Sequence, residues 1–292
     1  MLARLLLLAL SLLPLAEARA QAMPRVDWVL TDAPPSVITE GPLQGQGYVQ
    51  RMLTELLMPG LPGWQHEVQV GSSLRILRDL TERPTACTPY MTPTPARAKA
   101  FHLSRPMGYF LTPIGLVMRR DDPARPAAGA PLSLARYLAS PAQPRLAVVA
   151  GRSYSPPLDK VLARSRAQVQ ALPLTRATRS VLAMIVNRHD VDATLVGDVE
   201  FNYFLRLHPA WQDQLSWMRL SEQPDRLQYG VVGCARSAEG QRVIQALNRL
   251  LEQPEAQAQV QQLLEHWQTP EGLERLRRAR AAAPEFAPSQ AR

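Results

Sequence analysis

The sequence predicts an α/β protein built from about two structural units, and three observations support this. The chain has 292 residues, a length at which about two domains are expected. Short apolar runs alternate with stretches of helical spacing, as in parallel sheets flanked by helices. The composition is 46% apolar and 20% charged. That is enough apolar material for an ordinary core, and it excludes a disordered polymer.

In the first part of the chain, predicted strands and helices alternate. Strands are predicted at 26–30, 66–70 and 86–91. Helices are predicted at 48–57 and after Ser72, which would cap a helix carrying Leu74, Leu77 and Leu80. Two consecutive prolines, Pro34 and Pro35, follow the first strand and force a loop there.

The same alternation continues through the rest of the chain. The predicted strands are 116–118, 145–150, 169–172, 193–196, 215–220 and 229–234. The predicted helices are 132–138, 157–164, 176–188, one that ends near Leu207, 239–252 and 255–267. A tail at 281–292 is predicted to be disordered.

The first twenty residues have the pattern of a secretory signal peptide. A short basic start is followed by an apolar run at 5–15, and small residues at Ala18 and Ala20 suit a cleavage site. We expect cleavage near Ala20 or Ala22, which would make the mature protein periplasmic and soluble. The alternative is an uncleaved anchor, but the run is too short to span a bilayer comfortably.

Export changes what is expected of the two cysteines, Cys87 and Cys234. In an oxidising compartment two cysteines tend to pair. In the chain-entropy model, a bond closing so long a loop would stabilise the fold by roughly 5 kcal/mol. The alternative is two buried free thiols.

The formal charge of the chain is +8, and the basic residues are almost all arginine. Lys99 and Lys160 are the only lysines among 33 basic residues. Scattered arginines fit a biased composition at least as well as a groove for nucleic acid, so no nucleic-acid partner is predicted. Arg275, Arg277, Arg278 and Arg280 would stabilise a helix C-terminus, and the alternative is a patch for a membrane or partner.

The order of several short motifs resembles family 3 of the bacterial extracellular solute-binding proteins, the amino-acid-binding type. The resemblance covers about 26–267, nearly the whole mature chain. Its motifs are Asp32-Ala33-Pro34-Pro35 after the first strand, Gly47-Tyr48, Thr94-Pro95-Ala96-Arg97 followed by Phe101 to Pro106, Ala147 to Gly151, Val191-Asp192-Ala193, and Tyr229 to Val232.

The resemblance implies a periplasmic-binding-protein-like fold with two α/β lobes, each a mostly parallel sheet flanked by helices, joined by two hinge crossings. Lobe 1 would comprise 26–114 and 231–280, and lobe 2 would comprise 116–228. Cys87 and Cys234 would both fall on lobe 1 strands that the family places side by side, which supports their pairing. The function implied is trapping of a small polar solute between the lobes.

The resemblance places an anchor for a carboxylate at Arg97. Thr94 suits a helix N-cap and Pro95 the first helical position, so Arg97 would stand in the first turn. Its guanidinium can grip a carboxylate with two parallel hydrogen bonds. Thr92 and Ser153 match hydroxyl-bearing positions of the family's site. The alternative for Arg97 is an ordinary surface arginine.

Other site residues follow from the resemblance with departures. Asp198 is the candidate partner for an amino group, one position later than the family's aspartate. Tyr90 replaces a small hydroxyl residue in the site wall. Tyr154 is a candidate for the aromatic that stacks on the ligand, as are Tyr109 and Trp28, although Trp28 also fits the core. Asp32 would contact a polar tail or simply end a turn.

No motif predicts a metal or a cofactor. The five histidines have no metal-binding spacing, and neither a P-loop nor a G-x-S-x-G sequence is present. We therefore expect a non-enzymatic, monomeric binding protein with an ABC permease or membrane sensor as partner. One alternative is a periplasmic enzyme of dehydratase type, for which Glu200, Asp198 or His102 would supply acid/base chemistry. Another is a sensory module with weak or no solute binding.

Overall fold

The computed structural model describes residues 23–71, 73–111, 113–127, 130–149, 154–172, 177–223 and 225–283. The predicted signal peptide, Ser72 and Ser153 lie outside the described residues, as does the predicted tail from 284 onward. Residue 281 still belongs to the last helix, so that helix extends one residue into the predicted tail.

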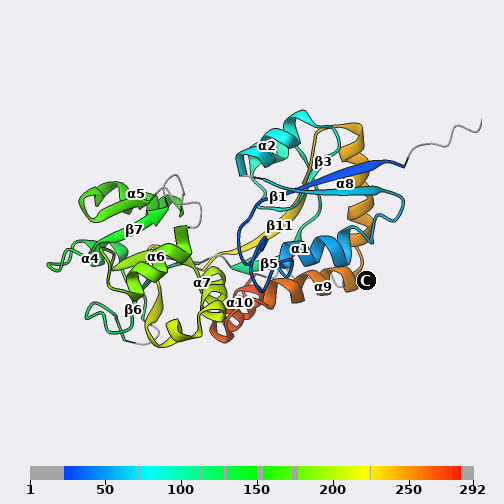
Figure 1. The fold of residues 1–292 in the computed structure, drawn as a ribbon. Helices are drawn as coiled ribbons and strands as arrows, with labels where there is room; N and C mark the ends of the chain where they lie inside the picture. Colours follow the sequence, from blue (N-terminus) through cyan, green and yellow to red (C-terminus); the bar gives the residue numbers. More distant parts are fainter. Residues whose placement is uncertain are drawn as a thin grey trace, which may run out of the picture.

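The chain folds into two α/β lobes, each with its own sheet (Figure 1). The lobe 1 sheet has the order β2-β1-β3-β11-β4, and β5 pairs with β11. Its strands are β1 (Arg25–Leu30), β2 (Gln65–Val70), β3 (Ala86–Met91), β4 (His102–Leu103), β5 (Met107–Leu111) and β11 (Leu227–Cys234). The lobe 2 sheet has the order β10-β6-β9-β7-β8. Its strands are β6 (Ile114–Arg119), β7 (Leu146–Val149), β8 (Val169–Leu172), β9 (Ala193–Gly197) and β10 (Leu215–Arg219).

Helices cover both sheets. In lobe 1 they are α1 (Tyr48–Met52), its π-helical continuation η1 (Leu53–Leu57), α2 (Ser73–Glu82), α3 (Pro95–Ala100), α8 (Ala238–Leu251) and α9 (Pro254–Glu265). In lobe 2 they are α4 (Leu134–Leu138), α5 (Pro156–Arg164), η2 (Arg166–Gln168), α6 (Ala177–Val186), α7 (Asp198–Leu207) and η3 (Pro209–Asp213). A final helix, α10 (Pro270–Ala281), lies at the junction of the lobes (Figure 1). Among the described residues, no helix is long and apolar enough to cross a bilayer.

Both sheets are mixed. β2, β1 and β3 run parallel, as do β9, β7 and β8. β11 is antiparallel to β3, β4 and β5, and β6 is antiparallel to β9 and β10. All of these antiparallel pairs involve β6 or β11, the strands next to the two crossings. Parallel neighbours need a helical crossover between them, whereas antiparallel neighbours do not.

The crossings also show where the predicted elements and the observed ones differ. β5 and β6 are separated only by residues 112 and 113, so the first crossing is a nearly continuous strand. The second crossing leads into β11, whose first half pairs with β5 and whose second half pairs with β3 and β4. β4 and β5 were not predicted, because two residues and a glycine-containing run give no clear apolar periodicity.

Each lobe has its own apolar core. In lobe 1, β1 and β11 pack between α1, η1, α8 and α9, with Trp28 fully buried among them. Trp28 is therefore a core residue. In lobe 2, one cluster forms around α6 and α7 and another around α4 and α5. Ile38, from the loop after β1, is buried in the first of these lobe 2 clusters, so this loop ties lobe 1 to lobe 2.

Cys87 and Cys234 form a disulfide, which confirms the predicted pairing. The two residues are directly opposite each other on β3 and β11, with a Cα–Cα distance of 4.1 Å. Both are fully buried in the lobe 1 core. The bond fastens the strand that returns from the second crossing to the middle of the lobe 1 sheet.

Candidate functional site

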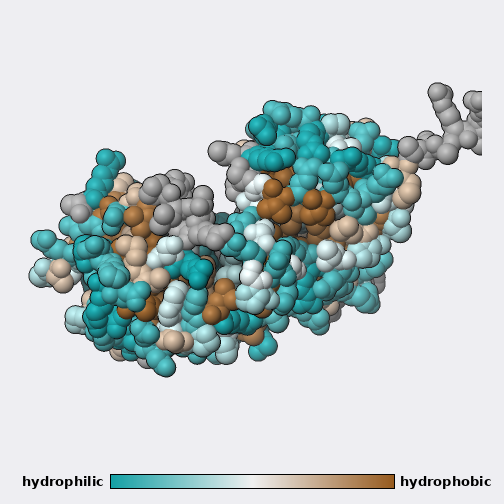
Figure 2. Space-filling model, viewed as in Figure 1, coloured by the Kyte–Doolittle hydropathy of each residue, from teal (hydrophilic) through white to brown (hydrophobic). Residues whose placement is uncertain are grey.

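A cavity of about 670 Å³ lies between the two lobes. Its lobe 1 wall is the loop after β1, over residues 32–42, and includes Asp32, Pro34, Ile38 and Glu40. Its lobe 2 wall is formed by the end of β7 and by α6 and α7, ending at His208. Space filling shows the surface hollowed where the lobes meet (Figure 2). Clefts of this size between domains are where small ligands usually bind.

The lobe 1 wall is held in shape by its own hydrogen bonds. The backbone N–H of Thr39 donates to Asp32 Oδ1 over 3.3 Å. The Gln50 side chain on α1 pairs with both the N–H and the C=O of Ile38, over 2.8 and 3.2 Å. With Ile38 also 1% exposed in the lobe 2 core, this loop presents Asp32 from a fixed backbone.

The lobe 2 wall combines a carboxylate with aromatic side chains. Glu200, in the first turn of α7, accepts a hydrogen bond from the Thr178 hydroxyl over 2.6 Å. Tyr203 and Phe204 follow on the same helix and are 5% and 8% exposed. They pack edge to face with ring centroids 5.1 Å apart. The wall therefore offers apolar surface beside a fixed negative charge.

The charges across the cavity influence one another. Burial raises the pKa of Tyr203, and the carboxylates of Asp32 and Glu40 raise it further. Both carboxylates belong to the opposite lobe, so the negative field of the lobe 1 loop reaches the lobe 2 wall. Burial, and then the nearby Arg179, lower the pKa of His208. His208 is therefore neutral at pH 7.

Arg97 does not line this cavity but lies at the same edge of the lobe 1 sheet. β1 and β3 are parallel neighbours, so the loops that follow them leave the sheet on one side. Thr94 caps α3 by accepting the Arg97 N–H over 3.2 Å, as predicted. Arg97 Nη1 donates to the Thr92 carbonyl over 2.6 Å. The guanidinium has five N–H donors, so most remain for a ligand.

Tyr90 lies deeper, between Tyr48 and Phe110. Its hydroxyl is buried without a hydrogen-bond partner among the described residues, and burial raises its pKa well above the usual value. A Cβ at Gly230 would collide with the Tyr90 ring. Glycine at position 230 thus leaves room for the Tyr90 ring against β11, where the ring packs on the lobe 1 core.

The structure places Tyr154 in the lobe 2 core instead of in a cavity wall. It is 6% exposed and packs in the apolar cluster around α4 and α5. Its hydroxyl accepts the Val149 N–H over 2.9 Å. This bond ties the Tyr154 side chain to the last residue of β7. A ring that is fully used in the core has no face left to stack on a ligand.

Asp198 is bound to another residue of the chain. Its Oδ2 is 2.8 Å from Nη2 of Arg275 on α10, and both side chains are 6% exposed. Arg275 Nη1 also meets Asp225 over 3.2 Å, and the guanidinium lies over the Trp217 ring. Burial raises the pKa of Asp198 to about 6, against the opposing attraction of Arg275. Together, Asp198, Arg275 and Asp225 join α7, α10 and the segment that leads into β11.

Of the three acid/base candidates of the enzyme alternative, only one lines the cavity. Glu200 lines the cavity, Asp198 is bound to Arg275, and His102 lies on β4 opposite Cys234. Among the described residues, no group of three or more His, Cys, Asp or Glu side chains is arranged to hold a metal ion.

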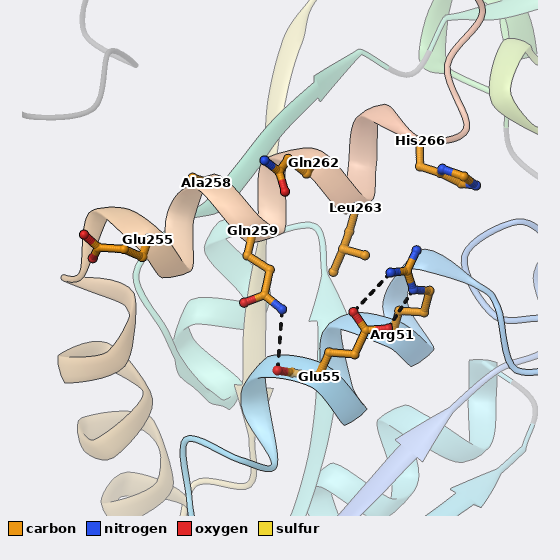
Figure 3. A pocket seen from close by; sticks show the side chains of 8 residues that line it. All are labelled: Arg51, Glu55, Glu255, Ala258, Gln259, Gln262, Leu263 and His266. Atoms are coloured by element: carbon orange, nitrogen blue, oxygen red, sulfur yellow. Dashed lines mark hydrogen bonds and ion pairs between the residues drawn. The ribbon is translucent and has the colours of Figure 1, made fainter.

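A second hollow of about 660 Å³ lies between α1, η1 and α9 of lobe 1 (Figure 3). Its floor is crossed by an ion pair in which Arg51 Nε lies 2.7 Å from Glu55 Oε1. The Gln259 side chain donates to the Glu55 carbonyl. None of the predicted site residues lines this hollow, and because it lies within one lobe, lobe closure would not enclose a solute there.

Several cavity residues were not predicted, among them Thr178, Arg179, Tyr203, Phe204 and His208. Both helices that carry them were predicted. The order of elements in the sequence could have pointed to α7 as a site helix. α7 begins directly after β9, so its first turns lie at the carboxyl edge of that strand. Ligands bind at this edge in open α/β folds.

The two sheets, the double crossing and the interlobe cavity define the two-lobe fold of the periplasmic binding proteins. No protein-family model and no curated protein sequence matches the chain. Among solved structures it is similar to the probable amino-acid ABC transporter extracellular-binding protein ytmK from Bacillus subtilis, with TM-score 0.61 and 12% identity over 85% of this chain and 99% of that one.

Two further solved structures are similar. The periplasmic VFT2 domain of BvgS from Bordetella pertussis has TM-score 0.56 and 17% identity, over 84% of this chain and 94% of that domain. An ancestral arginine-binding protein bound to arginine has TM-score 0.60 and 15% identity, over 83% of this chain and 97% of that one. Identities this low establish the fold alone.

Proposed function

We propose that the chain is an exported solute-binding protein that encloses a small, polar, carboxylate-bearing solute between its lobes. The observation that carries this proposal is the cavity of about 670 Å³ with one wall from each lobe. A solute that contacts both walls stabilises the closed arrangement by its differential affinity for that state. The names of the similar structures, which include amino-acid-binding proteins, support the same function.

The carboxylate of the solute is assigned to Arg97, with Thr92 and Ser153 as hydroxyl donors. Arg97 is partly exposed beyond the sheet edge where the parallel strands β1 and β3 end, and its contact with the Thr92 carbonyl orients the guanidinium. α3 has only six residues, so we attribute the attraction to the arginine and not to the helix dipole. No contact with an amino group is assigned to Asp198, and none with the solute to Tyr154 or Tyr90.

The proposal includes a location and partners. The signal-peptide pattern of the first twenty residues supports export to the periplasm. There the loaded protein would deliver its solute to an ABC permease, or report it to a membrane sensor, as a monomer. We propose no enzymatic activity, since only Glu200 of the three acid/base candidates lines the cavity, while Asp198 is bound to Arg275.

Replacing Arg97 by alanine should weaken binding of a carboxylate-bearing solute by about tenfold to a hundredfold, the range expected for a charge-assisted pair that is only partly buried. Arg97→Lys keeps the charge but loses the planar fork, so it should weaken binding less. The measurement is calorimetric titration with a compound found by a thermal-shift screen of amino acids and related acids, in which a bound compound raises the melting temperature.

Arg236→Ala is the matched control. Arg236 Nη1 also donates to a backbone carbonyl, that of Lys99, over 3.0 Å. It follows the end of β11, which runs opposite to β3, so it lies at the other edge of the sheet. Equal affinity of the Arg97→Ala variant and the wild type would remove Arg97 from the site. A collapse of the ligand-free melting temperature in Arg97→Ala would make Arg97 a structural residue.

A further inference from the structure

Two consecutive residues of the loop after β1 are buried in different lobes. Val37 belongs to the lobe 1 core, whereas Ile38 packs in the lobe 2 cluster around α6 and α7. Lobe 1 also holds the backbone of Ile38, because the Gln50 side chain on α1 bonds to both its N–H and its C=O. Consecutive Cα atoms lie about 3.8 Å apart. The chain therefore cannot lengthen at this point to let the lobes separate.

The chain makes a second connection of this kind where α9 ends. Leu264 is buried in the lobe 1 core, and Trp267 is buried in the same lobe 2 cluster as Ile38. Three residues span at most roughly 11 Å even when fully extended. Two side chains of α7 hold the segment in place. Asn202 donates to the Trp267 carbonyl over 2.9 Å, and Arg206 donates to the carbonyl of residue 266 over 3.0 Å.

The first residue of α7 meets the strand crossings. The Asp198 N–H donates to the Pro113 carbonyl in the first crossing. The Asp198 carboxylate pairs with Arg275 of α10, which also pairs with Asp225 ahead of β11. Figure 1 shows α7 and α10 together at the junction of the lobes. α7 is thus a lobe 2 helix to which the crossings and both of these connections are attached.

These attachments limit the ways in which the lobes can move. Ile38 is 1% exposed and Trp267 is 2% exposed, so pulling either out of the lobe 2 cluster would bring apolar surface into water, which is unfavourable. A rotation about α7 keeps both buried, because points near an axis of rotation move little. The largest movement would then occur at α2 and α5, which lie at the top of the two lobes in Figure 1, whereas α7 and α10 lie at the bottom.

We propose that α7 is the pivot of the two lobes. The connections at Val37–Ile38 and at Leu264–Trp267 stay attached to it when the angle between the lobes changes, and they restrict that angle in the solute-free protein. This inference goes beyond the proposed solute-binding function. It concerns the chain without a solute, so it can be tested whether or not the solute is known.

The test measures the distance between the far ends of the lobes in the solute-free protein. Spin labels at Glu82→Cys on α2 and Lys160→Cys on α5, both exposed positions, are read by pulsed electron–electron double resonance. Ile38→Ala and Trp267→Ala each loosen one connection. Ile185→Ala is the matched control, because Ile185 on α6 is fully buried in the same cluster as Ile38 but belongs to lobe 2 itself.

We expect the distance distributions of Ile38→Ala and Trp267→Ala to be broader than that of the wild type and to extend to longer distances, because a loosened connection permits a wider range of lobe angles. Ile185→Ala should lower the melting temperature about as much as Ile38→Ala, since both remove the same atoms from one apolar cluster. Its distance distribution should nevertheless match that of the wild type.

Two results would overturn the inference. One is that both Ile38→Ala and Trp267→Ala give the wild-type distribution. The other is equal broadening in Ile185→Ala, because the cause would then be a loosened lobe 2 core and not the connections to lobe 1.

Thermal melts of the labelled variants identify any loss of folding, and milder variants then replace those that do not fold. In place of Trp267→Ala, the Asn202→Ala/Arg206→Ala variant removes the two bonds from α7 to the segment after α9. In place of the two isoleucine-to-alanine variants, Ile38→Val is compared with Ile185→Val. The expected and the contradicting results stay the same.

Discussion

Removing the Cys87–Cys234 bond should destabilise the protein by roughly 5 kcal/mol, the value that the chain-entropy model gives for so long a loop. The bond joins residues 147 positions apart in a chain of 292, so its loss frees about half of the chain in the unfolded state. It also fastens β11 to β3 within the lobe 1 core. Urea unfolding of the oxidised protein, with and without reductant, measures the effect.

The Cys87→Ala/Cys234→Ala variant is the control for that experiment. The chain has only these two cysteines, so reductant should not move the unfolding midpoint of the variant. The variant should match the reduced wild type to within the small cost of two truncated side chains. Coincident unfolding curves for the oxidised and reduced wild type would contradict the predicted contribution of the bond.

Replacing Arg275 by methionine should cost about 3 kcal/mol of stability at pH 7.5, because breaking a buried ion pair leaves an uncompensated charge. Arg275 and Asp198 are both 6% exposed, and Asp225 shares the guanidinium. The cost should shrink at lower pH. Burial raises the pKa of Asp198 to about 6. Below that pH the carboxyl is neutral in the folded protein, so removing the positive charge of Arg275 lowers the free energy of unfolding by less.

Arg278→Met is the matched control on the same helix. Its partner Glu274 and Arg278 itself are about two-thirds exposed, and surface pairs contribute only about 0–1 kcal/mol. Adding Asp198→Asn to Arg275→Met should restore part of the lost stability, because no buried charge then remains unpaired at that position. Equal urea midpoints for Arg275→Met and Arg278→Met would show that the buried ion pair contributes no more to stability than the exposed one.

Most strands and helices follow from the pattern of apolar residues. Strand 86–91 and the helix at 239–252 were predicted within one residue of the observed β3 and α8. The strand is buried at almost every position, and the helix has a regular apolar face. The hinge region was harder to predict. β5 contains Gly108 and lies on the crossing, where pairing with β11 replaces a local apolar pattern as the reason for its strand conformation.

The site could be predicted only in part, because several of its residues contact partners that are far away in the sequence. Asp32 follows its strand directly and lines the cavity wall, while its predicted contact with a polar part of the solute stays a prediction. Asp198 meets Arg275, which is 77 residues later in the sequence, and no local spacing reveals such a partner. The burial of Ile38 in the lobe 2 core is likewise invisible in a loop that has no periodicity.

The central claim is that a solute bound between the lobes draws them together, and one distance measurement tests it directly. Spin labels are attached at Glu82→Cys on α2 and Lys160→Cys on α5, two exposed positions on helices that stand on facing lobes (Figure 1). The native cysteines are bonded to each other, so the introduced residues are labelled selectively. Pulsed electron–electron double resonance then gives the distance between the labels with and without a saturating concentration of a compound that the thermal-shift screen identifies.

We expect the distance between the two labels to become shorter, and its distribution narrower, when a compound shown by calorimetry to bind is added. At a concentration that just saturates the wild type, the same compound should shorten the distance less in the labelled Arg97→Ala variant, because that variant is expected to bind it more weakly. A wild-type distribution that stays the same at saturation would contradict enclosure of the solute by the two lobes.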